Sequence, residues 1–254
     1  MTPRLHVPGL LPSKTEAGLI LALPPGPARH AQVLRLQPGS ALTLFDSTGG
    51  QWQASVAAMG RKDVSVTLGA FEPGDPLELL TSVTLAVGMP ANDRMDALVE
   101  KATELGVAAI QPLMTSRSVL RLDGERAAKK VAHWQSVAEA AAEQSGRTRV
   151  PTILPVSTLK AWLPTVDASW QRGVLSFEPL VQAAAWIQQL AQAAPSSQGQ
   201  PPLVFLSGPE GGLAPDETHQ CTQLGWTAVG LGPRVLRADT APLMALSLVA
   251  ALRG

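Results

Sequence analysis

Several features that would define the class of this chain are scarce or absent. Cys221 is the single cysteine among 254 residues, which excludes an internal disulfide and a cysteine-rich zinc site. The chain has no long uncharged apolar run, and the segment that begins at Met1 lacks the apolar core of a signal peptide. Twenty lysines and arginines balance twenty aspartates and glutamates, so net charge exerts no overall pull towards nucleic acid. We expect a globular cytoplasmic protein, with no membrane contact, that would hold any polyanion through a local patch.

Patterns for metal binding and acyl chemistry are also missing. The four histidines show no metal-ligand spacing, so no metal site is expected. No G-x-S-x-G nucleophile elbow occurs, and Cys221 has no cationic neighbours that would activate its thiol. We therefore interpret Cys221 as a buried or idle thiol, and find no support for hydrolytic acyl chemistry.

The apolar pattern divides the chain into two parts. Residues 42–45 and 52–56 flank a turn-rich stretch and predict a hairpin, and residues 64–68 alternate in the same way. This first part is expected to contain short strands rather than helices. Two prolines and a glycine within 72–76 then indicate a boundary. The expected domains are 1–75 and 76–254.

Apolar runs alternate with helical periods in the second part. The expected strands are 83–87, 107–113, 150–154, 173–177, 203–207 and 227–231. The expected helices are one capped by Asn92 with an apolar face from Met95 to Leu105, one from about Val131 that ends at Gly146, and three near 179–194, 215–224 and 239–252. This alternation predicts an α/β domain with a largely parallel sheet.

Two glycine-bearing turns directly follow expected strands. They are Ser207–Gly212 and Gly232–Arg237, at the carboxyl ends of strands, where open α/β sheets bind ligands. The glycine spacing matches neither a P-loop nor a dinucleotide fingerprint, and Glu210 would repel a phosphate. A ligand with neutral or positive polar groups is favoured. Tight turns without a ligand remain the alternative.

Basic residues gather locally despite the zero net charge. Arg117, Arg121, Arg126, Lys129 and Lys130 lie between positions 117 and 130. Such a cluster suits contacts with a phosphate backbone. A solvated helix face is the alternative interpretation.

Separated motifs identify a resemblance that covers nearly the whole chain. They are RMD at 94–96, KATELGV at 101–107, EAAAEQSGR at 139–147, GPEGG at 208–212 and LGPRVLRADTA at 231–241, with weaker matches at 33–36, 44–46 and 49–50. In this order the motifs resemble the RsmE family of bacterial 16S ribosomal RNA uridine-N3 methyltransferases, of the SPOUT class. The family commonly has glutamate where this chain has Asp239. Aspartate keeps the charge, so we interpret the change as variation rather than inactivation.

The resemblance implies a fold, a reaction and partners. It implies a PUA-like β-barrel that helps to hold RNA, followed by an α/β SPOUT domain with a carboxyl-terminal deep trefoil knot. The implied reaction is transfer of a methyl group from S-adenosylmethionine to N3 of a specific uridine in the decoding region of 16S ribosomal RNA. The implied substrate is the assembled 30S subunit, and the implied oligomer is a homodimer.

The resemblance also implies site residues. The cofactor would lie between Leu206, Ser207, Gly208, Pro209, Glu210 and Gly211 on one loop and Leu231, Gly232, Arg234, Val235, Leu236, Arg237, Asp239, Thr240 and Ala241 on the other. Arg237, and after it Arg234, would stabilise a deprotonated uracil, unless they bind phosphate or hold the loop. Glu210 and Asp239 are the nearest candidates for a general base. RNA would contact Arg4, Arg35, Arg117, Arg121 and Arg147.

Two other functions remain open from the residues. The same fold could methylate a ribose 2′-hydroxyl or another base. Alternatively, the chain could be an RNA-binding or ribosome-assembly factor without catalysis, although the intact motifs at 208–212 and 231–241 disfavour this.

Overall fold

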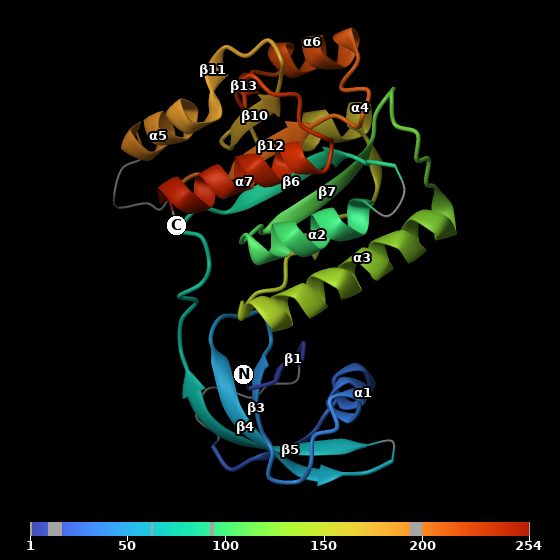
Figure 1. The fold of residues 1–254 in the computed structure, drawn as a ribbon, viewed down its shortest axis with the longest axis vertical. Coiled ribbons are helices and arrows are strands. Elements are labelled where there is room, and N and C mark those ends of the chain that lie inside the picture. The colour runs from blue at the N-terminus through green and yellow to red at the C-terminus, as the bar shows by residue number, and fades with distance from the viewer. Residues whose placement is uncertain (1, 10–16, 62, 92–93, 194–199, 254) are drawn as a thin grey trace. The chain divides into compact units, whose positions relative to one another are not determined.

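The chain folds into two compact units. The computed structural model, drawn in Figure 1, describes residues 2–9, 17–61, 63–91, 94–193 and 200–253. One unit combines Met1–Glu78 with Ala142–Val150, and the other combines Leu79–Ala141 with Pro151–Gly254. The expected helix cap Asn92 lies outside the described residues. The inclusion of Ala142–Val150 in the first unit is a feature that the apolar pattern did not indicate.

The first unit is built on a five-stranded sheet. The strands are β1 (Arg4–His6), β2 (Ile20–Ala22), β3 (Ala41–Phe45), β4 (Gln51–Met59) and β5 (Val64–Glu72), in the order β1-β3-β4-β5-β2. The predicted hairpin is confirmed, because Leu44 pairs with Trp52 in an antiparallel β3–β4 ladder. Alternate residues of β4 and β5 are buried, so one face of the sheet carries the core of this unit.

A helix in the first unit corrects the expectation of strands alone. Helix α1 (Pro25–Val33) begins in a proline-rich stretch that resembles a loop in sequence. Prolines are nevertheless tolerated in the first turn, where backbone N–H groups have no helical acceptor. Ala28 and Ala31 are buried and join the core of the sheet. Because α1 is only nine residues long and its buried side chains are those of alanine, its sequence shows little helical periodicity.

Polar contacts join the segment Ala142–Val150 to the rest of the first unit. Asp75 accepts hydrogen bonds from the Thr148 hydroxyl, from Arg149 Nε at 2.9 Å and from the Gly50 N–H at 3.2 Å. Burial alone would raise the pKa of Asp75, but the bonds from Thr148, Arg149 and Gly50 together hold that pKa below its ordinary value. The Asp75 carboxylate is therefore a tie between three stretches of chain.

The second unit contains a parallel sheet, which confirms the predicted α/β class. Its strands are β6 (Val83–Gly88), β7 (Ala109–Met114), β8 (Thr152–Ile153), β9 (Ser157–Thr158), β10 (Gln171–Leu175), β11 (Val181–Gln182), β12 (Leu203–Ser207) and β13 (Thr227–Gly230). The order is β11-β13-β10-β12-β6-β7-β8, with β9 beside β7, and every pairing is parallel. All residues of β6 and β12 are buried, which explains their continuous apolar runs.

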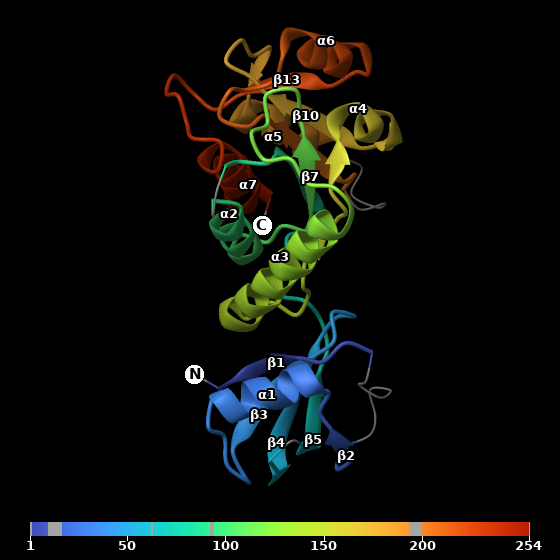
Figure 2. The same ribbon diagram turned by 90° about the vertical axis from the view of Figure 1, so that its right-hand side faces the viewer.

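Helices cover both faces of this sheet. They are α2 (Arg94–Glu104), α3 (Gly124–Ser145), α4 (Leu159–Trp162), α5 (Ala183–Ala193), α6 (Pro215–Gln223) and α7 (Thr240–Arg253), with a 3-10 turn at Leu163–Thr165. Trp186 of α5 meets Phe205 of β12 edge-on at 5.7 Å between ring centroids, and α7 contacts α5, α2, β12 and β6. Leu159 of α4 and Cys221 of α6 pack on the opposite face, around Leu206. Figure 2 shows α2 and α7 on one side of the strands and α4 on the other.

The helix expected from about Val131 begins earlier, at Gly124, so the basic residues from Arg126 to Lys130 lie on α3. Two expected elements at the sheet edges also differ in extent from the observed ones. The helix expected at 179–194 begins at Ala183, because Val181 and Gln182 first pair with β13. The strand expected at 150–154 is reduced to Thr152–Ile153. In both cases the difference lies at a sheet edge, where pairing with a neighbour rather than local pattern decides the boundary.

Candidate functional site

The two central strands β6 and β12 send their connections in opposite directions. They pair side by side, with Val87 opposite Ser207 at their carboxyl ends. From β6 the chain runs through α2 to β7, whereas from β12 it runs through α6 to β13 on the other side of the sheet order. Ligands of open α/β sheets bind where neighbouring connections diverge in this way. The predicted GPEGG turn lies at this point.

The turn after β12 is closely packed. A Cβ on Gly208 would lie 2.6 Å from the backbone carbon of Gly212, and a Cβ on Gly88 would lie 2.6 Å from Pro209 Cδ. The Gly212 N–H donates to the Pro209 carbonyl at 2.8 Å, and Gly212 has a φ of +67°. Glycine is required where backbone approaches backbone at these distances. The turn is therefore a rigid structure seated on the end of β6.

Glu210 connects this turn to the start of α2. Its Oε1 accepts a hydrogen bond from the Ala91 N–H at 3.0 Å and lies 3.3 Å from Arg94 Nη1. The two side chains are each about one-third exposed, at 35% for Glu210 and 36% for Arg94. The Glu210 charge is thus matched by an arginine, and the carboxylate holds the turn in place.

The segment after β7 is bound to the same turn. Arg117, which the sequence assigned to RNA, donates from Nη1 to the Gly211 carbonyl at 2.7 Å. Glu217 is buried and accepts from the Ser116 N–H and the Ala214 N–H, each at 2.8 Å. Glu217 is not among the site residues expected from the sequence. The sequence feature that could have identified Glu217 is its place in the first turn of an expected helix, where a carboxylate accepts hydrogen bonds from free backbone N–H groups.

The second loop follows β13 and leads into α7. The Gly232 N–H donates to Gln182 Oε1 at 3.1 Å, and Gly232 has a φ of +92°. The Thr240 and Ala241 N–H groups both donate to the Arg237 carbonyl at 3.0 Å. Arg234 and Arg237 are exposed, and neither forms an ion pair with any residue that the structure describes. Their guanidinium groups are open to an incoming ligand.

Each of the two loops carries a buried polar atom that lacks a partner. Ser207 Oγ, at the end of β12, and Asp239 Oδ1, just before α7, form no hydrogen bond within the described part of the chain. An unsatisfied buried polar group costs about 1–3 kcal/mol. A ligand with polar groups would satisfy both atoms, so the residues present fit such a ligand. Among the residues that the structure describes, other atoms of this kind lie outside these loops, namely Arg4 Nε, Ser145 Oγ and Trp226 Nε1.

The arginines expected to bind RNA fall into two groups. Arg35 and Arg121 are exposed, and Arg121 Nη2 also donates to the Ser116 carbonyl at 3.2 Å. Arg4 is half-buried beside the Phe45 ring, 5.2 Å from its centroid, and burial lowers the pKa of Arg4. Arg147 is only 3% exposed and donates from Nε to Glu78 Oε1 at 3.1 Å. The expectation for Arg147 is therefore corrected, because its guanidinium is enclosed in an ion pair of the first unit.

The remaining expectations concern thiol chemistry, metals and membranes. Cys221 is fully buried, and burial together with nearby Glu217 raises the pKa of its thiol to about 12, which agrees with an idle thiol. Within the described ranges, no three histidine, cysteine, aspartate or glutamate side chains gather as metal ligands. None of the described helices is long and apolar enough to cross a bilayer.

Comparison with protein families matches both units. Residues 77–250 match a family described as the RNA methyltransferase domain, and residues 28–69 match the RNA methyltransferase PUA domain. Ribosomal RNA small subunit methyltransferase E from Bacillus subtilis is 31% identical over 217 residues, which cover 85% of this chain and 84% of that protein. The Mycobacterium tuberculosis protein of the same name is 32% identical, over 87% of this chain and 82% of its own length.

Two solved structures share the whole architecture. Ribosomal RNA small subunit methyltransferase E from Neisseria gonorrhoeae, bound to S-adenosylmethionine, has a TM-score of 0.82 and 31% identity, over 99% of this chain and 98% of that one. A methyltransferase from Legionella pneumophila in complex with S-adenosylmethionine has a TM-score of 0.85 and 30% identity with the same coverage. On this similarity of sequence and fold, the chain belongs to the ribosomal RNA small subunit methyltransferase E family.

Proposed function

We propose that this protein transfers the methyl group of S-adenosylmethionine to N3 of a specific decoding-region uridine of 16S ribosomal RNA. Its substrate would be the assembled 30S subunit in the cytoplasm. Family membership supports ribosomal RNA methylation, and two similar structures hold S-adenosylmethionine. The observation that carries the proposal is the pair of unpartnered polar atoms on Ser207 and Asp239, one on each loop of the site.

The cofactor would lie between the two loops. Backbone groups of the turn Leu206–Gly211 and of the segment Leu231–Ala241 would hold its adenine, ribose and methionine parts, with Ser207 Oγ satisfied by one of its polar groups. The bound cofactor supplies an electrophilic methyl group. The packed turn, held by Glu210 and Arg117, would position that group with little loss of order on binding.

The uracil must present its Watson–Crick edge, so the target nucleotide has to be unpaired or turned out of its stack. Its N3–H proton would leave before or during transfer, and the N3 lone pair would form the bond to the methyl carbon as the methyl–sulfur bond breaks and S-adenosylhomocysteine is released. Negative charge develops on O2 and O4. Arg237 first, and Arg234 second, would donate to these oxygens, because both guanidinium groups are exposed near the second loop.

Of the two candidate carboxylates, one is better suited to accept the N3 proton of the uracil. Glu210 Oε1 already accepts bonds from the Ala91 N–H and from Arg94, so this oxygen is engaged within the protein. Asp239 retains an oxygen without a partner among the described residues. We therefore favour Asp239 over Glu210 as the group that accepts the N3 proton, with water as the other acceptor.

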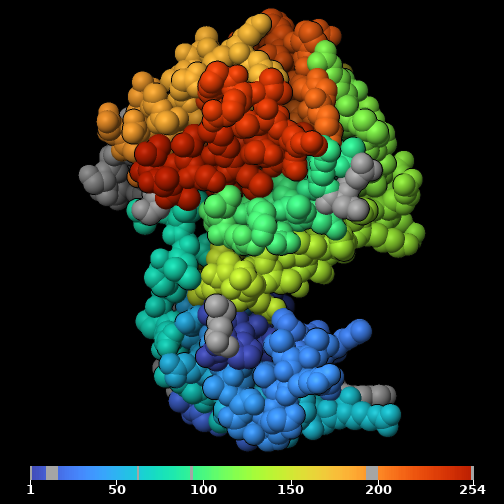
Figure 3. All heavy atoms as spheres, viewed as in Figure 1, coloured from blue at the N-terminus to red at the C-terminus, as the bar shows by residue number. Residues whose placement is uncertain are grey.

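Two features support the finer aspects of the fold. Helix α7 follows the second loop and contacts both β6 and β12, as a segment threaded into a trefoil knot would. In the space-filling view, the carboxyl-terminal segment, red, borders the atoms of α2, green (Figure 3). In the first unit, β4 and β5 have two register shifts, which bend a sheet towards a barrel. We propose the knot and the PUA-like barrel on these grounds.

A homodimer is proposed on the exposed apolar side chains around β13. Phe177 is 76% exposed, Leu180 82% and Val235 81%. The Leu180 N–H donates to the Ala228 carbonyl, so these segments flank the same strand. Clusters of large exposed apolar side chains mark protein interfaces.

The experiment that tests the proposed function is nucleoside analysis. The protein is incubated with S-adenosylmethionine and 30S subunits that lack the modification, and the digested 16S RNA is examined by mass spectrometry. We expect 3-methyluridine. A ribose-methylated nucleoside or another methylated base would refute the uridine-N3 assignment. No product, together with no S-adenosylmethionine binding in calorimetry, would favour a non-catalytic RNA-binding factor.

A further inference from the structure

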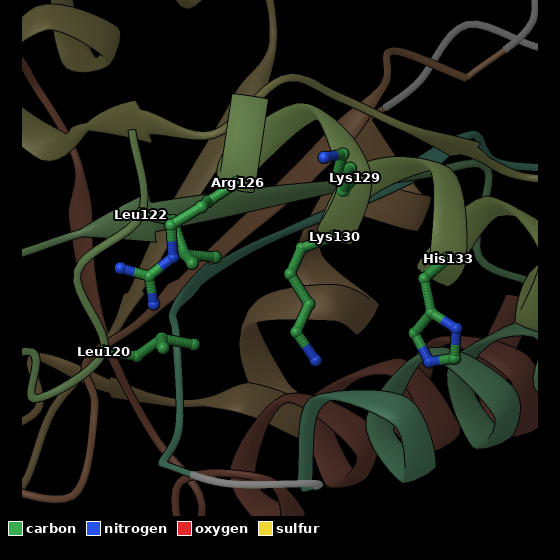
Figure 4. Close-up of a pocket in the computed structure, with 6 residues that line it drawn as sticks. All are labelled: Leu120, Leu122, Arg126, Lys129, Lys130 and His133. Atoms are coloured by element: carbon green, nitrogen blue, oxygen red, sulfur yellow. The ribbon is translucent and has the colours of Figure 1, made fainter. Parts of the chain in front are cut away.

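A basic depression lies on the amino-terminal half of α3. It measures about 410 Å³ and is lined by Leu120, Leu122, Arg126, Lys129, Lys130 and His133. Lys129 and Lys130 follow Arg126 by three and four positions, and His133 follows them by four and three, so the four basic residues share one face of the helix. Figure 4 shows Arg126, Lys130 and His133 following one another along α3, with Leu120 and Leu122 on the preceding segment. None of these six residues belongs to the loops described above.

Free positive charge is concentrated there. Arg126 and Lys130 form no ion pair with any residue that the structure describes, and no carboxylate lines the depression. Lys129 contacts Glu125 at 3.4 Å, but both side chains are largely exposed, so this pair is weak and exchangeable. His133 is held by Asp96 of α2 at 2.7 Å. A surface of this kind attracts a polyanion.

The depression combines these cations with an apolar floor. Leu122 is 4% exposed and Leu120 is partly buried. A phosphodiester would be bound by the arginine and lysine, and a ribose or unstacked base would lie against the leucines. A free inorganic anion would leave the apolar floor unused. The lining therefore favours a strand of single-stranded RNA.

The depression is also connected to the proposed site. Its floor belongs to the segment from Arg117 to Leu122, whose first residue donates to the Gly211 carbonyl of the cofactor turn. Asp96, which holds His133, lies on α2 two positions after Arg94, the partner of Glu210. Both the floor and the rim of the depression are therefore linked to the turn that carries Glu210 and Gly211.

We propose that this depression binds the phosphate backbone of the RNA strand that flanks the target nucleotide. The proposal rests on the proposed function, because it names the RNA contact of the same site. Arg126 and Lys130 are its phosphate-binding residues. Lys129 and His133 form its rim.

The test compares the variant R126A/K130A with the native protein in filter binding to unmodified 30S subunits across a salt series. We expect about tenfold weaker binding, and a double-logarithmic salt slope that is shallower by about 0.7–0.9 for each phosphate that the variant no longer binds. Two controls are matched. K160A removes an exposed lysine from α4, and R126K/K130R keeps both charges; both should bind as the native protein does. Calorimetry with S-adenosylmethionine should be unchanged in all three variants.

The outcomes separate this proposal from the proposed function. Native affinity and slope in R126A/K130A would overturn the depression as an RNA site even if 3-methyluridine is formed. Weaker binding with an unchanged salt slope would also overturn it, because the two side chains would then bind a ribosomal protein rather than phosphate. A shallower slope without any 3-methyluridine from the native protein would support the depression and refute the uridine-N3 reaction.

Discussion

At the scale of single residues, the site depends on a few hydrogen-bonding atoms with distinct environments. Glu210 is matched by Arg94 and a backbone N–H, whereas Asp239 Oδ1 and Ser207 Oγ have no partner within the described residues. Arg234 and Arg237 face solvent from the loop between β13 and α7. Glu210, whose hydrogen bonds are formed within the protein, holds the site together, whereas Ser207 and Asp239 each have an atom that can bond to a ligand. Substitution of the latter two should therefore affect ligand binding and chemistry more than folding stability.

Replacing Arg237 with alanine should abolish most methyl transfer. Loss of one donor to a developing oxyanion typically costs about 100- to 1000-fold in turnover. S-adenosylmethionine binding in calorimetry should persist, because Arg237 contributes its backbone carbonyl rather than its side chain to the start of α7. R234A is the matched variant and should lose less activity. Near-native turnover of R237A would show that Arg237 has no role at the uracil.

At the scale of elements, the turn after β12 is shaped by backbone packing. Gly208 and Gly212 approach so closely that no Cβ fits between them, and Gly88 leaves room for Pro209. The Arg117 and Glu217 contacts then join this turn to β7 and α6. A small change in this turn should therefore be transmitted to the whole cofactor site.

The variant G208A should weaken S-adenosylmethionine binding by at least tenfold, measured by calorimetry. Its new Cβ would lie 2.6 Å from the Gly212 backbone carbon, so the turn must shift. A shift of this kind costs about 1–3 kcal/mol. G26A on α1 is the control, since its Cβ would meet nothing within 4 Å and alanine favours a helix. Unchanged affinity in G208A would contradict the placement of the cofactor at this turn.

At the scale of the whole molecule, each unit draws on distant parts of the chain. The first unit requires Ala142–Val150, which lies beyond the first helices of the second unit. Arg147 and Glu78 are 69 positions apart, and Arg149 and Asp75 are 74 apart. The two units are therefore interleaved in sequence, and neither can be cut out as one continuous piece.

The tie at Asp75 predicts a pH dependence of stability. Because the pKa of Asp75 is lower in the folded state, its contribution is fully present above the unfolded pKa of about 3.9 and is lost as pH falls through the folded value. D75N should lower the melting temperature near pH 7, with a free-energy cost of about 1–3 kcal/mol. Thermal unfolding of both proteins from pH 7 to pH 2 should show the difference shrinking below about pH 4. A constant difference would assign the loss to packing rather than charge.

The proposed homodimer predicts that a charged residue on its apolar surface lowers the mass of the assembly in solution from that of a dimer to that of a monomer. L180D places a charge on an apolar side chain that is 82% exposed, so it should leave the folded chain intact and separate the protomers in sedimentation analysis. V33D in the first unit is the control, at a side chain that is 70% exposed and far from β13 in sequence. A native dimer mass for L180D would exclude this surface as the interface.

The amino-acid sequence by itself determined the apolar strands, most helices, both loops and the family. These features depend on local periodicity, on glycine positions and on contiguous motifs, all of which can be recognised in the linear sequence without the fold. Helix α1, the burial of Arg147 and the contacts Arg117–Gly211 and Glu210–Arg94 were decided only by the tertiary structure. The last two join residues 94 and 116 positions apart, so whether an arginine meets RNA or a carbonyl is set by which distant segments pack beside it.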